Sequence, residues 1–147
     1  MKDIVTNKKA YHDYEIIEKY EVGVSLVGSE VKSLRAGKVS LKEAYVSFVS
    51  GEAYIKSMHI AEYKDATYNN HEETRDRKLL LHKKEINKLF SKCKIKGFTC
   101  IPLRIYFNDR GRIKIEIALA RGKTLYDKRM SDKQKTMEKA AAQALKR

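Results

Sequence analysis

Four histidines, at positions 12, 59, 71 and 82, are the side chains of this chain that could act as acid or base near neutral pH. A two-histidine ribonuclease would need two of them beside one phosphate, an arrangement that the sequence leaves open. The sequence contains no phosphate loop ending in Gly-Lys-Ser/Thr, no Gly-x-Ser-x-Gly elbow and no His-Glu-x-x-His pair. We therefore expect a protein that is not an enzyme and needs no cofactor.

The two cysteines, Cys93 and Cys100, could in principle bind a metal or form a disulfide. Neither belongs to a Cys-x-x-Cys pair, and neither has a histidine at the spacing of a zinc site. Both fall on apolar faces of the elements predicted below. We expect core thiols and no metal site.

Two basic segments carry side chains that RNA recognition uses. Residues 7–14, NKKAYHDY, combine an amide, two ammonium groups, an imidazole and two aromatic rings, although Tyr14 could equally be a core residue. Residues 74–84, TRDRKLLLHKK, place basic residues around three leucines. Either all three leucines enter the core, or the middle one stays outside as an apolar surface for an unstacked base. The candidate RNA contacts in these segments are Asn7, Lys8, Lys9, His12, Arg77, Lys78 and Leu80.

The net charge of +13, from 32 basic and 19 acidic residues in 147, favours a polyanionic partner. Residues 121–147 alone hold nine basic and three acidic residues, or +6 of that charge. An anionic membrane would attract the same charge, but no stretch approaches the ~20 apolar residues of a membrane span. No N-terminal apolar run resembles a signal peptide either. We expect a cytoplasmic protein with no membrane partner.

Apolar periodicity locates the elements that must position these residues. Residues 1–10 show none and are expected to be mobile. Residues 14–28 read as one long bent strand or two short ones, with a bulge at Gly23. Residues 29–37 read as a short helix. A tight turn at residues 51–52 separates two strand-like runs and predicts a hairpin.

The second half of the chain has clearer patterns after a polar connection over residues 61–78. Residues 82–97 predict an amphipathic helix, with His82 and Glu85 spaced as a capping pair. The apolar face of that helix consists of Ile86, Leu89, Phe90 and Cys93. Two strands follow, over residues 98–107 and 112–120, and Pro102 predicts an edge or a bulge in the first.

These elements predict a mainly β fold with peripheral helices. The most compatible architecture is a six-stranded antiparallel barrel of the oligonucleotide-binding type with two or three helices. Residues 1–121 would form this barrel domain. Residues 122–147 would form a basic tail that is disordered or becomes helical on RNA, because its narrow apolar stripe is too weak to fold alone.

Four blocks in register carry a resemblance to a known family. NKKAYHDYEI, YEVGVSLVGSEVKSLRAGKVSL, RDRKLLLHKKEI and GKTLYDKR are similar to segments of the SsrA-binding protein family, also called small protein B. The match runs from about Asn7 to Arg129. The resemblance implies a non-enzymatic protein that binds transfer-messenger RNA (tmRNA) and escorts it to stalled ribosomes for trans-translation.

The same resemblance implies partners and roles. The barrel would bind the tRNA-like domain of tmRNA and replace its missing anticodon arm. Elongation factor Tu would deliver the alanyl-tmRNA complex, and the tail would sense an empty messenger channel beyond the decoding centre. We expect the protein to be a monomer. The alternative is another ribosome-associated RNA-binding barrel protein, with a ribonuclease as a more distant possibility.

Residue by residue, the resemblance assigns tmRNA contacts to Asn7, Glu21, Leu80 and Lys114. It assigns contacts at the decoding site to His12, Gly122, Lys123, Tyr126, Asp127, Lys128 and Arg129. The sequence departs from the family pattern at Thr124, which replaces a lysine, and at Glu62 and Glu73, which replace prolines. We expect one fewer phosphate contact and looser loops at these positions.

Overall fold

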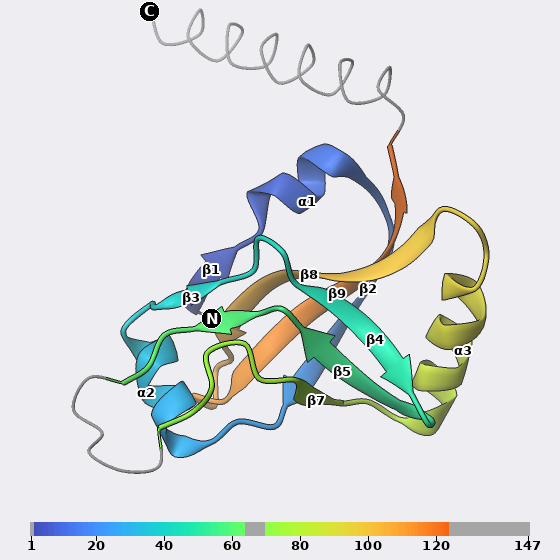
Figure 1. Cartoon of the computed structure of the whole chain (residues 1–147). Helices are drawn as coiled ribbons and strands as arrows, with labels where there is room; N and C mark the ends of the chain where they lie inside the picture. The colour runs from blue at the N-terminus through green and yellow to red at the C-terminus, as the bar shows by residue number, and fades with distance from the viewer. Residues whose placement is uncertain (1, 64–69, 124–147) are drawn as a thin grey trace, which may run out of the picture.

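The computed structural model describes residues 2–63 and 70–123. Their elements, in chain order, are β1 Lys2–Thr6, α1 Lys8–Asp13, β2 Tyr14–Val24, α2 Gly28–Arg35, β3 Val39–Ser40, β4 Tyr45–Val49, β5 Glu52–Lys56, β6 His59–Ile60, β7 Arg77–Leu80, α3 Lys83–Cys93, β8 Phe98–Phe107 and β9 Ile113–Gly122. Seven strands form one antiparallel sheet in the order β1-β8-β9-β2-β7-β5-β4, and β3 pairs with β6. The predicted mainly β fold with peripheral helices is confirmed (Figure 1).

The sheet curves until its edge strand β4 lies against β8 (Figure 1). Six strands, β8, β9, β2, β7, β5 and β4, therefore surround one apolar core, to which Leu34 of α2 and Leu89 of α3 also contribute. The strand count differs slightly from the predicted six, because the main sheet has seven strands. Strand β1 and the pair β3–β6 are additional to the prediction.

The N-terminus differs from its prediction. Instead of a mobile segment over residues 1–10, residues 2–6 form β1, which pairs with β8 from Lys2 opposite Phe107 to Thr6 opposite Arg104. Helix α1 follows directly. The prediction failed because Ile4 and Val5 are adjacent rather than alternating, yet both pack against the core across a register shift in β1.

The bulge in β2 is also not where the sequence placed it. It lies between Ile16 and Glu18, whereas pairing with β9 is regular through Gly23. The bulge expected at Pro102 is confirmed, since the register of β8 shifts between Pro102 and Arg104. The β4–β5 hairpin is confirmed as well, although its turn residues are 50 and 51, both with positive φ.

Helix α3 begins as predicted, because the His82 backbone N–H donates to the Glu85 carboxylate at 3.2 Å. The helix is fastened to the sheet by Glu18 in the β2 bulge. The Glu18 carboxylate accepts hydrogen bonds from Lys92 Nζ at 2.6 Å and the Tyr20 hydroxyl at 2.5 Å. These bonds, chiefly that of Lys92, lower the pKa of Glu18 to about 2.

Both cysteines are free thiols, as expected. Cys100 is fully buried in the core and Cys93 is half-buried against it. Burial raises the pKa of both thiols above the ordinary value.

Candidate nucleic-acid interface

Gly23 lies between two of the predicted RNA contacts, Leu80 and Lys114, on the outer face of the barrel. It lies directly opposite Leu80 of β7 on one side and directly opposite Lys114 of β9 on the other. Side chains directly opposite each other in antiparallel strands share one face of the sheet. Leu80 is 56 % exposed and Lys114 is half-buried, so both lie on the solvent side.

Glu21 belongs to the same face, because it precedes Gly23 by two residues in the strand. Its carboxylate accepts a hydrogen bond from the Tyr106 hydroxyl, and Tyr106 lies directly opposite Lys114. Burial and then the Glu21 carboxylate raise the pKa of Tyr106, so this hydroxyl keeps its proton at neutral pH. Glu21, Leu80 and Lys114, which are distant in sequence, therefore converge on one surface, which we call the outer sheet face.

Arg104 extends this surface and was missed from the sequence. Its guanidinium lies 4.2 Å from the Tyr106 ring centroid and donates to Asp3 at 2.7 Å and to Glu116 at 3.5 Å. The guanidinium therefore lies over the Tyr106 ring and is held there by one carboxylate of β1 and one of β9. Strand alternation in β8, which buries Ile105 between the two residues, is the signal that could have identified the pair.

Leu80 also borders a groove between β7 and the start of α3. The three leucines separate as the second interpretation predicted: Leu79 is buried, Leu80 is exposed and Leu81 is half-buried. The groove has a volume of about 390 Å³. Lys78 and Lys83 line it, and Lys78 lies 3.4 Å from Glu52 in an exposed ion pair. An apolar floor with ammonium groups beside it suits an unstacked base and its phosphate.

Arg77 is not a candidate RNA contact, and this prediction is corrected. Its side chain is fully buried, where Nε donates to Glu30 and Nη1 donates to the Met58 carbonyl at 2.7 Å. Glu30 also accepts from Arg75 at 2.6 Å. Burial alone would raise the pKa of Glu30, but Arg75, the Val27 N–H and Arg77 together lower it. Alternation in β7 points residues 77 and 79 inward and 78 and 80 outward, so Arg77 has a structural role.

Asn7 is also committed to the fold. It is only 8 % exposed and caps α1, where its Oδ1 accepts from the Ala10 N–H at 3.3 Å. Its Nδ2 donates to the carbonyls of Leu41 at 3.3 Å and Pro102 at 3.1 Å. Asn7 therefore joins α1 to the residue that follows β3 and to the middle of β8. This arrangement differs from the predicted role as a base or ribose contact.

The predicted decoding-site residues within the structure lie together at one end of the barrel. Gly122 lies opposite Tyr14, and the backbone N–H of Lys123 donates to the Asp13 carbonyl at 2.9 Å. His12 Nδ1 lies 2.9 Å from Asp13 Oδ1, and its side chain is 35 % exposed. Helix α1 thus holds His12 beside the point where β9 ends. Lys8 and Lys9 are exposed on the same helix, and Tyr126, Asp127, Lys128 and Arg129 lie outside the described residues.

The remaining histidines have structural contacts. His71 is buried and bonds Ser29 Oγ and the Ile60 carbonyl, both at 2.8 Å. The position of His59 at the end of an apolar strand-like run favours a hydrogen-bonded core histidine. This prediction is wrong, because the side chain is 44 % exposed and pairs with Glu73 at 2.8 Å. Within residues 2–63 and 70–123, no group of three His, Cys, Asp or Glu side chains could hold a metal ion. The helices of this part of the chain include none long and apolar enough to cross a membrane.

The model of the family described as SmpB protein matches residues 4–147 of this chain. The chain belongs to the SmpB family. It is 55 % identical to the SsrA-binding protein of Nitratiruptor sp. over 99 % of this chain and 98 % of that protein. It is 53 % identical to the SsrA-binding protein of Sulfurihydrogenibium sp. over 99 % and 95 % of the two chains.

A solved structure agrees with this membership. The chain matches it with a TM-score of 0.69 and 49 % identity, over 90 % of this chain and 93 % of that one. That structure is described as "tmRNA-SmpB: a journey to the center of the bacterial ribosome". The barrel, the outer sheet face and the end of β9 are therefore features of an SmpB family member.

Proposed function

We propose that this chain binds tmRNA through its outer sheet face and accompanies it to stalled ribosomes for trans-translation. The observation that carries the proposal is the convergence of Glu21, Leu80 and Lys114 across three neighbouring strands in a chain of the SmpB family. An ammonium group can pair with phosphate, and an exposed leucine can cover an unstacked base. A carboxylate held by Tyr106 can accept from base N–H groups, which adds specificity.

The role is one of binding and delivery, without catalysis. The barrel takes the place of the anticodon arm against the tRNA-like domain, as a monomer. The alanyl-tmRNA complex is carried by elongation factor Tu. The last strand ends beside helix α1 and His12, which supports a role at the decoding centre for the segment that follows Lys123. That segment, with its basic residues Lys128 and Arg129, senses that the messenger channel is empty.

Substitution of Leu80 tests the proposed surface. Leu80→Ser should weaken tmRNA binding by about 1–2 kcal/mol, or roughly five- to thirtyfold, because about half of a leucine side chain loses its apolar contact. Ile95→Ser is the matched control, since Ile95 is also 56 % exposed but follows the end of α3, whereas Leu80 precedes its start. Fluorescence titration with labelled tmRNA gives both affinities. Equal losses for the two variants would contradict the proposed surface.

The RNA that co-purifies with the full chain separates this function from the alternative. A tmRNA-binding protein should enrich tmRNA over ribosomal and messenger RNA. An RNA-binding barrel of another kind would recover ribosomal RNA or mixed messages without that enrichment. Sequencing of the bound RNA therefore decides between the two.

A further inference from the structure

The barrel is open along one seam. Strand β4 is the last strand of the sheet, and β8 pairs with β1 only from Arg104 to Phe107. Over residues 98–101, the edge of β8 that faces β4 has no strand partner among the described residues. Backbone groups on two strand edges therefore face each other across a gap.

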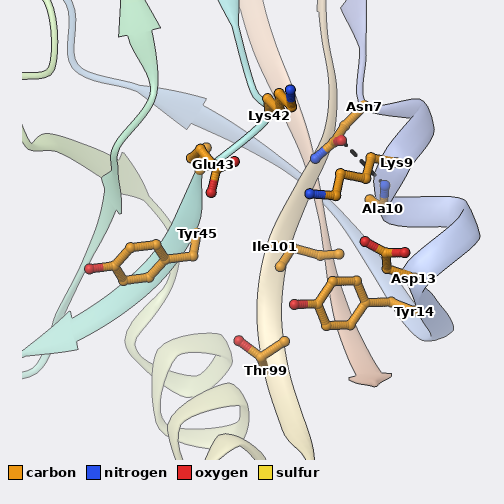
Figure 2. Close-up of a pocket in the computed structure, with 11 residues that line it drawn as sticks. Asn7, Lys9, Ala10, Asp13, Tyr14, Lys42, Glu43, Tyr45, Thr99 and Ile101 are labelled. Atoms are coloured by element: carbon orange, nitrogen blue, oxygen red, sulfur yellow. Dashed lines mark hydrogen bonds between the residues drawn. The ribbon is translucent and has the colours of Figure 1, made fainter. Parts of the chain in front are cut away.

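A pocket of about 330 Å³ lies in this seam, beside α1 (Figure 2). Its floor includes Ile101 of β8. Lys9 of α1 and Tyr14 of β2 reach into the gap toward Glu43, which precedes β4 on the other side. Thr99 adds a hydroxyl from β8. The pocket thus combines the ammonium groups of Lys9 and Lys42, the carboxylates of Asp13 and Glu43, the Thr99 hydroxyl, and the rings and hydroxyls of two tyrosines, Tyr14 and Tyr45.

The width of the seam excludes an added peptide strand. A strand inserted between β4 and β8 would hold them about 9.6 Å apart, twice the normal spacing of neighbouring strands. The two strands already approach within 8 Å between Cα atoms. A volume of about 330 Å³ lies at the small end of the range for ligand pockets, so the seam suits one small, flat group.

The charged, hydroxyl and aromatic groups of the lining favour a nucleotide as the ligand. An apolar ligand would offer no partner to the charged and hydroxyl groups that line the pocket. A bare phosphate would be repelled by the Glu43 carboxylate. A nucleotide can pair with groups of both signs, because its phosphate can pair with Lys9 or Lys42 while N–H groups of the base donate to Glu43. The Tyr14 ring and Ile101 offer an apolar surface to the base.

We propose that the seam pocket binds a single unpaired nucleotide of RNA, a contact separate from the outer sheet face. The inference rests on the proposed function, since the nucleotide would belong to tmRNA or to ribosomal RNA. Guanine fits best, because its two neighbouring N–H donors can both reach one carboxylate. Asn7 supports the pocket by holding α1 to the carbonyls of Leu41 and Pro102.

The test is an NMR titration of the full chain with GMP, UMP and inorganic phosphate. GMP should produce saturable shifts at the amides of Thr99 and Tyr45 that phosphate does not reproduce. Glu43→Gln should weaken GMP binding about tenfold, because a charge-assisted acceptor is lost. Glu62→Gln, which changes an exposed glutamate outside the pocket, is the control and should leave GMP binding unchanged. Absence of these shifts, or identical shifts with phosphate, would overturn the proposal.

Binding of tmRNA by the same protein preparation separates the two hypotheses. If tmRNA binds while GMP does not, the pocket proposal alone is wrong; if neither binds, the proposed function fails too. Ultraviolet cross-linking with mass spectrometry then identifies the source. An adduct on the Tyr14 peptide with tmRNA alone indicates a tmRNA nucleotide, and an adduct that requires ribosomes indicates ribosomal RNA. No adduct under either condition would contradict occupation of the pocket by RNA.

Discussion

Gly23 lies directly opposite Leu80, and a Cβ on residue 23 would lie 3.2 Å from Leu80 Cδ1. The missing side chain lets the exposed leucine rest on the backbone of β2. This close approach, and not a bulge, is the structural reason for a glycine inside a long strand. The absence of a Cβ at residue 23 therefore determines where Leu80 lies on the outer sheet face.

Gly23→Ala should displace Leu80 and weaken tmRNA binding with little loss of stability. The crowded atom is the end of an exposed side chain, so we expect the free energy of unfolding to change by less than about 1 kcal/mol. Methyl NMR of Leu80 and tmRNA titration measure the two effects. Gly28→Ala is the control, because no atom lies within 4 Å of its new Cβ. A shifted Leu80 methyl with unchanged affinity would exclude Leu80 from the interface.

Arg77→Met should lower the free energy of unfolding by about 3–5 kcal/mol, because it leaves Glu30 buried without one of its partners. Lys78→Met, one residue later, should change that free energy by less than about 1 kcal/mol, since its ion pair with Glu52 is exposed. Lys78→Met should instead reduce tmRNA affinity and its salt dependence. Urea unfolding and RNA titration at several salt concentrations measure the two properties. A mild stability loss for Arg77→Met would contradict the structural role.

Asn7→Asp should destabilise the fold by about 1–3 kcal/mol although aspartate is a good helix cap. The new carboxylate oxygen would face the Leu41 and Pro102 carbonyls, where Nδ2 now donates. Asn87→Asp, on the exposed face of α3, is the control and should have little effect. Thermal unfolding monitored by circular dichroism compares the two. Normal stability with lost tmRNA affinity would instead support a direct RNA contact by Asn7.

Acid should weaken the attachment of α3 through Glu18. The folded pKa of about 2 lies below the ordinary 4.5, so the unfolded chain binds more protons between these values. The contribution of Glu18 to stability is present above about pH 4.5 and is lost as the pH falls toward 2. Glu18→Gln should therefore flatten the decline of the urea midpoint over this range. A variant that declines as steeply as the parent protein would show that Glu18 does not contribute.

The sequence predicts those parts of the fold whose patterns are local. The α3 helix, the β4–β5 hairpin and the Pro102 bulge follow from periodicity, capping and turn residues, and all three were found. The burial of Leu79 and the exposure of Leu80 could also be predicted, because adjacent residues of a strand face opposite sides of the sheet. The exact position of the turn, at residues 50 and 51, was missed by one residue.

Features that depend on distant partners could not be predicted in this way. Strand β1 forms because β8 offers an edge about a hundred residues away, and the sequence of residues 2–6 has no alternation to indicate it. Arg77 resembles a surface basic residue until Glu30, from another element, is placed beside it. The seam pocket likewise requires knowing that β4 returns to β8. The resemblance located the residues of the outer sheet face, but only the strand register shows that they are neighbours.

The hydrogen bond from the Lys123 backbone N–H to the Asp13 carbonyl fixes the end of β9 against α1. It fixes the origin of residues 124–147 beside α1, so their reach is measured from one known point. Twenty-four residues can span at most about 86 Å when fully extended. The end of β9 is therefore a fixed point, and adding or deleting residues directly after Lys123 changes the greatest distance from α1 that each later residue can reach.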